Sequence, residues 1–149
     1  SGYFRNEAAN EAFYWTDAEG TTFHRTGDIG MFDADGFLVL LDRKKDMIIS
    51  GGFNIYAVDL EEKLLEHPGI ADAAVIAVPS ERWGEMPLGL VVPRAGAALD
   101  PAEVLAWTNA RLGKMQRIAA VELRQDLPRS SVGKVLKQAL RRPYWETRR

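Results

Sequence analysis

Short apolar segments constrain the fold of this 149-residue chain most strongly. Residues 70–79 are rich in alanine, valine and isoleucine, and residues 88–92 read Leu-Gly-Leu-Val-Val. Such runs, bounded by turn residues, are typical of buried strands. Further strands are predicted over 118–123 and 47–49. Because helical patterns are interleaved with these segments, we expect the α+β class, with a small central β-sheet and flanking helices; an α/β fold with a small sheet is the alternative.

Three helices are predicted around these strands. Residues 58–67 have apolar side chains at helical spacing and acids in the first turn, which suit the positive end of the helix dipole. Asp100 followed by Pro101 is typical of an N-cap with proline at the first helical position. A last helix is expected over 135–142, ended by Pro143.

The N-terminal third is expected to form a β-hairpin. Residues 29–32 and 37–41 are apolar and flank an Asp-Ala-Asp-Gly turn at 33–36. The five consecutive charged residues 42–46 then break the apolar pattern, and we place a linker or domain boundary there.

Composition excludes several classes of site. The apolar share of 46% suffices for a core, and the absence of cysteine excludes disulfides, thiolate metal sites and a cysteine nucleophile. With two histidines, no histidine-based metal site is expected. No apolar run is long enough for a membrane span or a secretory signal, so the default expectation is a cytoplasmic protein. The first residues, Ser-Gly-Tyr, predict a processed chain or, as we favour, a piece of a longer one.

Charge is unevenly spread along the chain. Residues 1–110 hold 8 Lys+Arg and 18 Asp+Glu, a balance of −10, whereas residues 111–149 hold 11 and 3, a balance of +8. A basic end can contact nucleic acid, a membrane surface or a phosphate-bearing ligand, or it can be a solvated helix. Because no nucleic-acid motif accompanies it, no nucleic-acid partner is expected.

Lys134 is the most informative residue for function. It lies in residues 128–137, which read Pro-Arg-Ser-Ser-Val-Gly-Lys-Val-Leu-Lys. Glycine lets the backbone approach an anion closely, and lysine adds a long cation. A second Gly/Lys/Asp cluster lies upstream, at 26–28 and 42–46. Together these segments predict that the chain binds a nucleotide phosphate. They also predict that it supplies only some of the residues that the complete site needs.

The segments resemble, in order, motifs at the C-terminal end of adenylate-forming enzymes: acyl-CoA synthetases, luciferases and the adenylation domains of peptide synthetases. The matching segments are residues 25–28, 42–56, 59–61, 78–85 and 128–134. Ser80 stands where the family usually has aspartate, and Ser130 where it has threonine.

The resemblance implies a two-step reaction and a domain division. A carboxylic acid attacks Mg·ATP to give an acyl-adenylate, the C-terminal domain rotates, and a thiol displaces AMP to give a thioester. Residues 1–42 would be the tail of a large N-terminal domain and residues 43–149 a mobile lid. ATP, Mg²⁺ and CoA would bind mainly with the protein's own N-terminal domain, which is absent from this chain; no metal ligands are assigned here.

The resemblance also implies roles for three residues near the boundary. Asp28 would bind the ribose hydroxyls of ATP; the alternative is a turn aspartate that bonds its own backbone. Arg43 would lie near the ribose and phosphates, the alternative being a surface ion pair of little energy. Lys45 would be the hinge residue about which the C-terminal domain rotates. The alternative is a solvated lysine in a run of charged residues.

Three further residues receive implied roles in the lid. Gly51 and Gly52 would line the tunnel for the pantetheine arm of CoA, where missing side chains let the arm pass; the alternative is a tight turn that needs positive φ. Lys134 would be catalytic, bridging the carboxylate and the α-phosphate during adenylation. The alternative is an exposed lysine after a glycine turn.

Three functions follow as hypotheses. The first is the lid of an acid–thiol ligase, an AMP-forming fatty-acyl-CoA synthetase, because residues 43–54 look most like the CoA-ligase branch. The second is an adenylation domain that loads the phosphopantetheine of a carrier protein. The third is a stand-alone binding module without catalysis. In each case this chain by itself is expected to be inactive in adenylation.

Overall fold

The computed structural model describes residues 5–146, and the chain divides into two compact units between Lys45 and Asp46. The first unit begins with helix α1 (Glu7–Phe13), whose N-cap Asn6 accepts a backbone hydrogen bond through its side chain. Strands β1 (Tyr14–Thr16) and β2 (Thr22–His24) follow as a short antiparallel pair.

A second hairpin completes the first unit. Strands β3 (Asp28–Phe32) and β4 (Leu38–Arg43) pair antiparallel, and Asp33 closes the turn by accepting two backbone N–H groups through Oδ1. The hairpin predicted at 29–41 is therefore confirmed, and its pairing continues to Asp28 and Arg43. Six of its apolar side chains are 41–71% exposed: Met31, Phe32, Phe37, Leu38, Val39 and Leu40.

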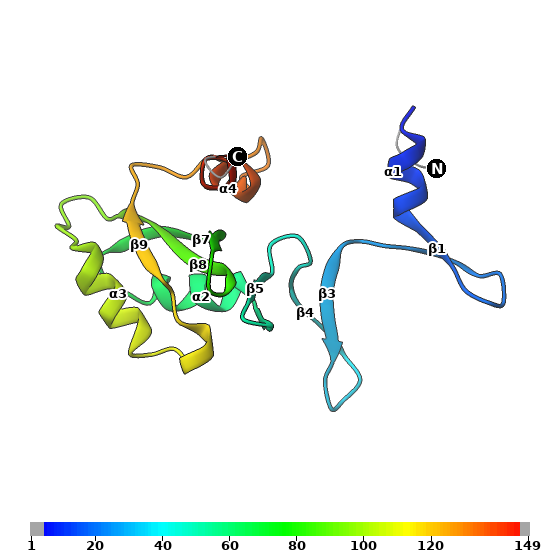
Figure 1. The fold of residues 1–149 in the computed structure, drawn as a ribbon, viewed down its shortest axis with the longest axis horizontal. Coiled ribbons are helices and arrows are strands. Elements are labelled where there is room, and N and C mark those ends of the chain that lie inside the picture. The colour runs from blue at the N-terminus through cyan, green and yellow to red at the C-terminus, as the bar shows by residue number, and fades with distance from the viewer. Residues whose placement is uncertain (1–4, 147–149) are drawn as a thin grey trace. The chain divides into compact units, whose positions relative to one another are not determined.

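The second unit is built on a five-stranded sheet with the order β6-β5-β8-β7, in which β9 also pairs with β8 (Figure 1). Its strands are β5 (Ile48–Ser50), β6 (Phe53–Ile55), β7 (Ile70–Ser80), β8 (Gly84–Pro93) and β9 (Ala120–Leu123). All pairs are antiparallel except β8 with β9. This sheet and its helices confirm the α+β class; β6 is an addition to the predicted strands.

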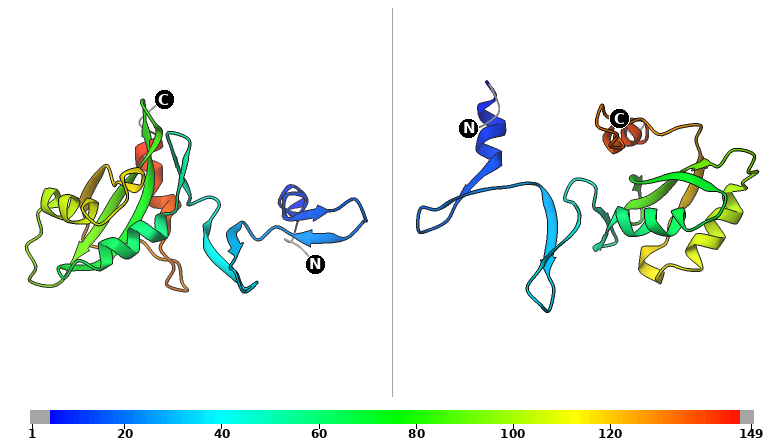
Figure 2. Two further views of the ribbon diagram at one scale, coloured as in Figure 1. Left: turned by 90° about the horizontal axis from the view of Figure 1, so that it is seen from below. Right: turned by 180° about the vertical axis from the view of Figure 1, so that it is seen from behind.

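Helices cover both faces of this sheet (Figure 2). They are α2 (Ala57–Leu65), α3 (Pro101–Asn109) and α4 (Lys137–Glu146), and a 3₁₀ turn, η1, spans Lys114–Gln116. Side chains 73, 75 and 77 of β7 join a cluster with α2 and α3, whereas 74 and 76 join a second cluster packed against α4. Burial on both faces explains why residues 73–78 of the strand are all apolar.

The prediction for the last helix was wrong at its C-terminal end. Pro143 does not end α4 but lies inside it, and the helix continues to Glu146. Contacts beyond the proline explain the continuation: Trp145 Nε1 donates to the carbonyl of Ala77 at 3.0 Å, and the Tyr144 hydroxyl donates to Glu122 Oε2 at 2.7 Å. These tertiary contacts outweigh the local cost of proline in a helix. Across residues 5–146 we find no helix with the length and apolar character needed to span a membrane.

The contact of Tyr144 with β9 makes stability sensitive to alkaline pH. Burial, and then the hydrogen bond to and charge of Glu122, raise the pKa of Tyr144 above its ordinary 10.0, although Arg124 opposes the shift. Because the pKa is higher in the folded chain than in the unfolded one, this stabilisation is complete below about pH 10 and is lost as pH rises through the folded pKa.

We therefore expect Tyr144→Phe, which has no ionisable hydroxyl, to lose less stability than wild type between about pH 9 and pH 11. Urea unfolding at a series of pH values measures this as the slope of unfolding free energy against pH. An identical slope in the two proteins would contradict the role assigned to Tyr144.

Candidate functional site

Asp28 and Arg43 face each other at the open end of the β3–β4 hairpin. They are register partners, and Arg43 Nε lies 2.7 Å from Asp28 Oδ1. The hairpin thus brings together two residues that are 15 positions apart in the sequence. The Asp28 side chain is 27% exposed and the Arg43 side chain 43%, so both remain accessible. Carboxylate oxygens have several lone pairs, which leaves Asp28 acceptor capacity beyond this ion pair.

The residues before Asp28 fix its position. The Thr26 hydroxyl accepts the Asp28 N–H at 3.2 Å, and the Gly27 carbonyl accepts the N–H of Lys44 at 2.8 Å. Gly27 has φ +79°, in the left-handed region that favours glycine. The Thr-Gly-Asp segment therefore has a defined backbone geometry, while the ribose-binding role remains a prediction.

Lys45 lies where the first unit ends. It follows β4 in a turn, its side chain is exposed, and the chain divides directly after it. A change of backbone angles at this residue would not disrupt a strand. The position suits a hinge, but the hinge role remains a prediction, as does the domain boundary expected after residue 42.

Gly51 and Gly52 form the turn between β5 and β6, with φ +56° and +85°. The N–H of Gly51 donates to the carbonyl of Trp83 at 2.9 Å, and a Cβ at Gly51 would lie 2.7 Å from Cε3 of that indole. A Cβ at Gly52 would meet nothing within 4 Å. The tight-turn interpretation is therefore correct for both glycines, and Gly51 is also required by the contact with Trp83.

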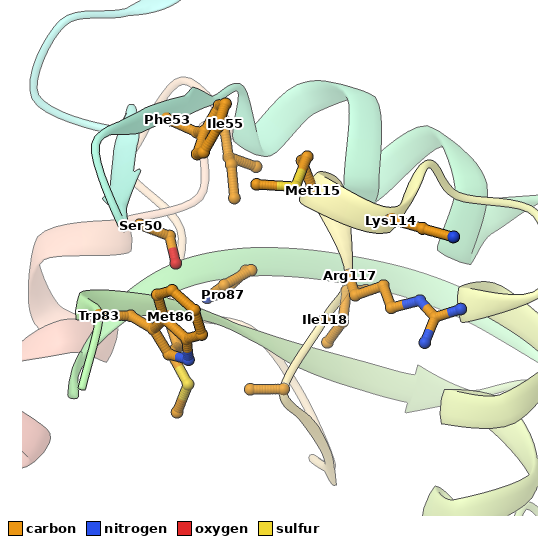
Figure 3. A pocket seen from close by; sticks show the side chains of 11 residues that line it. Ser50, Phe53, Ile55, Trp83, Met86, Pro87, Lys114, Met115, Arg117 and Ile118 are labelled. Atoms are coloured by element: carbon orange, nitrogen blue, oxygen red, sulfur yellow. The ribbon is translucent and has the colours of Figure 1, made fainter. Parts of the chain in front are cut away.

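A cavity of about 270 Å³ adjoins this glycine turn (Figure 3). Ser50 and Phe53, which flank the two glycines, lie on its wall. Figure 3 shows Trp83 near Ser50 at one end and the Lys114 and Arg117 side chains at the other. Its walls are mainly apolar, with the two cations toward one end, and belong entirely to the second unit.

Glu85 supports the glycine turn, a role that was not predicted from the sequence. Its Oε2 accepts the N–H of Ile49 in β5 at 2.9 Å, and its Oε1 lies 3.5 Å from Arg141 Nη2 in α4. In the preceding turn, the Ser80 hydroxyl accepts the N–H of Trp83 at 3.2 Å. Serine in place of the family's usual aspartate thus still supplies a side-chain acceptor.

Lys134 lies in a hairpin between β9 and α4. An isolated bridge joins Arg129 to Val135, and Gly133 turns the chain with φ +81°. The Lys134 side chain is exposed, and no carboxylate within residues 5–146 pairs with its ammonium group. An ammonium buried in an internal ion pair would have ruled out the catalytic assignment. The structure instead leaves this cation accessible, and its role remains a prediction.

A partly buried ion pair fixes the start of α4, three residues after Lys134. Lys137 Nζ lies 2.7 Å from Glu61 Oε1, and these side chains are only 13% and 17% exposed. The same carboxylate oxygen accepts the N–H of Val75 at 2.7 Å. The pair thereby joins α4 to α2 and β7. Glu61 lies in residues 59–61, one of the segments that resemble adenylate-forming enzymes, but its partner could not be predicted from the sequence.

Within residues 5–146 no group of three or more histidine or acidic side chains could hold a metal ion. The described residues thus do not fit a Mg²⁺ site of their own. The first unit presents a carboxylate beside a guanidinium, and the second unit separately presents an accessible ammonium.

The chain has relatives among curated proteins. At 42% identity over 138 residues, the chain resembles a feruloyl-CoA synthase from Amycolatopsis, covering 88% of this chain and 28% of the relative. It is also 42% identical over 144 residues to a long-chain-fatty-acid–CoA ligase from Thermus thermophilus, covering 96% and 26%. The chain thus spans little more than a quarter of each relative's length.

Solved structures with a similar fold are also found. ATP-bound MatB from Rhodopseudomonas palustris matches with a TM-score of 0.85 at 35% identity, covering 100% of this chain and 29% of that one. The o-succinylbenzoate CoA synthetase MenE from Bacillus subtilis, in complex with its acyl-adenylate intermediate, matches with a TM-score of 0.81 at 36% identity, covering 94% and 28%.

The sequence profile of the AMP-binding enzyme C-terminal domain matches residues 59–134, which run from α2 to Lys134. This span includes strands β7 and β8, Glu85, and the hairpin of Lys134 up to that lysine. The chain belongs to the AMP-binding enzyme C-terminal domain family.

Proposed function

We propose that this chain is the C-terminal part of an AMP-forming acid–CoA ligase. In the first step the substrate carboxylate attacks the α-phosphate of ATP, forming a mixed anhydride and releasing pyrophosphate. In the second step the CoA thiol attacks the acyl carbonyl, loses its proton and displaces AMP. The observation that carries the proposal is the accessible ammonium of Lys134, unpaired among the described residues 5–146, on a backbone-defined turn in a chain related to CoA ligases.

Two groups of residues would act in the first step. Asp28, held by Arg43, would accept hydrogen bonds from the ribose hydroxyls of ATP. Lys134 would stabilise the negative charge that grows on the phosphate oxygens, which a positioned cation does best where water is excluded. Mg²⁺, when bound with ATP, neutralises phosphate charge, and its ligands would come from outside the described residues.

The second step would use other residues of the lid. After rotation about Lys45, the turn at Gly51 and Gly52 would line the path of the pantetheine arm. The adjoining cavity supports this assignment, because residues on either side of the glycines contribute to its wall. Missing side chains allow a ligand to pass close to the backbone.

A larger N-terminal domain would complete the enzyme. We propose that residues 1–42 are its tail and residues 43–149 the lid. The apolar side chains exposed on the β3–β4 hairpin support this division, because an exposed apolar patch is typical of a surface that packs against another domain or protein. The chain alone would not catalyse adenylation, because Asp28, Arg43 and Lys134 cannot by themselves form an acid pocket. The expected cytoplasmic location is part of the same proposal.

CoA is the acceptor that the relatives favour, because the feruloyl, fatty-acid and succinylbenzoate relatives are all named as CoA ligases or synthases. A carrier-protein arm remains the second candidate, since its phosphopantetheine is chemically the same as that of CoA. For the acid we propose a fatty acid. The aromatic and fatty-acid relatives are equally similar at 42% identity, so the acid must be tested directly.

An acid panel on the full-length enzyme tests the substrate. We expect ATP–pyrophosphate exchange to be fastest with fatty acids, and thioester formation to proceed with CoA but not with a holo-carrier protein. Exchange with hydroxycinnamic acids only would reject the fatty-acid assignment. No exchange with any acid would reject the ligase function.

Lys134→Ala in the full-length enzyme tests the first step. Acid-dependent ATP–pyrophosphate exchange should fall by at least about 100-fold, the order expected for one positioned electrostatic group. Thioester formation from synthetic acyl-adenylate should change little, because the rotated lid no longer presents this residue. Lys63→Ala, at a partly exposed lysine of α2 that pairs with Glu66, is the control for loss of a lysine elsewhere in the second unit. Equal losses in both half-reactions would reject the catalytic assignment.

Lys45→Pro tests the hinge. Proline fixes φ near −65° and should hinder rotation, so thioester formation should be impaired more than adenylation. Lys45→Ala removes the same side chain without fixing φ and should leave both half-reactions near wild type. If the proline variant lost adenylation more than thioester formation, the hinge would lie elsewhere.

A further inference from the structure

The backbone on both sides of Lys134 is held by hydrogen bonds. The peptide group before it is fixed at both ends: the Gly133 carbonyl accepts from Arg129 Nη1 at 2.7 Å, and the Lys134 N–H donates to Ser130 Oγ at 3.2 Å. The Lys134 carbonyl accepts the Ser130 N–H at 2.8 Å. With both flanking peptide groups fixed, the direction of the Lys134 Cα–Cβ bond is fixed as well.

Arg129 also ties this turn to the sheet. Its Nη2 forms an ion pair with Asp72 Oδ2 on β7, while Asp72 Oδ1 accepts the N–H of the buried Ala73 at 3.0 Å. One guanidinium therefore links the carbonyl directly before Lys134 to a strand of the core. The planar fork of arginine allows this, because its nitrogens reach two acceptors at once in a fixed geometry.

Global stability is a poor explanation for this link. The Arg129 and Asp72 side chains are 44% and 32% exposed, and ion pairs at such positions contribute little to folding stability. The nearby helix α4 is separately fixed by the much less exposed Lys137–Glu61 pair. Arg129 thus acts chiefly on the turn itself.

We propose that Arg129 is a positioning residue for adenylate formation, setting the direction in which Lys134 extends from the lid. This inference rests on the proposed function. Lysine has a long flexible side chain, so a fixed Cα–Cβ direction reduces the number of places its ammonium can occupy. The effect belongs to the first half-reaction, in which Lys134 acts.

The test uses Arg129→Lys in the full-length ligase. This variant keeps the charge but replaces the fork with one nitrogen. ATP–pyrophosphate exchange should fall by about 10- to 100-fold, the range expected for misplacing a reacting group by about 1 Å. Thioester formation from synthetic acyl-adenylate should stay at the wild-type rate. Arg94→Lys, at an arginine that hydrogen-bonds elsewhere, is the matched control and should leave both rates unchanged.

Asp72→Asn tests the other end of the link, on β7. It should lower the rate of ATP–pyrophosphate exchange by less than Arg129→Lys does and leave thioester formation unchanged. The double variant should exchange no more slowly than Arg129→Lys alone, because the two side chains act as one unit. Independent losses that multiply in the double variant would overturn the inference.

Amide hydrogen exchange supplies a readout that does not depend on activity. In Arg129→Lys the amides of residues 130–136 should exchange faster, while those of β7 and β8 and the thermal midpoint stay near wild type. The inference would be overturned if amide exchange of residues 130–136 were unchanged in the variant. It would also be overturned if that exchange were faster while adenylation kept its full activity.

The Lys134→Ala variant separates this inference from the proposed function. If Lys134→Ala selectively abolishes adenylation but Arg129→Lys retains it, only the positioning role is wrong. If Lys134→Ala has no selective effect, the catalytic assignment fails and the positioning role fails with it.

Discussion

The antiparallel pairing of β7 with β8 is the interaction on which the second unit depends. It runs from Ile70 to Ser80, and side chains on both faces of β7 are buried. One face receives α2 and α3, and the other receives α4. Both turns of the candidate site in the second unit are connected to this pair: Glu85, in β8, accepts from the strand before the glycine turn, and Asp72, in β7, pairs with Arg129. A rigid pair of strands thus carries two exposed turns with different chemistry.

If the second unit is the proposed lid, the division between packed support and exposed turns suits action in two orientations. Loops placed on a well-packed scaffold can present reactive groups without large internal rearrangement. One turn offers a cation and the other offers backbone without side chains, and under the proposed function the two turns would act in different steps of one reaction. The lid would then change its role through its orientation and leave its fold intact.

Much of this arrangement could be predicted from the sequence, because its signals are local. The apolar run at 70–79 identified a buried strand, the Asp-Gly turn identified the hairpin, and the glycine before Lys134 identified an unusual turn. What could not be predicted depends on contacts between distant residues. Pro143 stays inside α4 because Tyr144 and Trp145 reach β9 and β7, and Arg129 meets Asp72 across 57 positions of sequence. The motif segments suggested roles for Asp28 and Arg43, but only the register of β3 with β4 joins them in an ion pair.

The β3–β4 hairpin has a practical consequence for work with this chain. It is a two-stranded sheet, so the outer backbone groups of both strands are available, and its apolar side chains from Met31 to Leu40 are exposed. Open strand edges beside apolar surface promote self-association. Recombinant samples that contain this hairpin without a covering partner should therefore precipitate more readily than a version starting at Asp46, which retains the whole packed sheet and its helices.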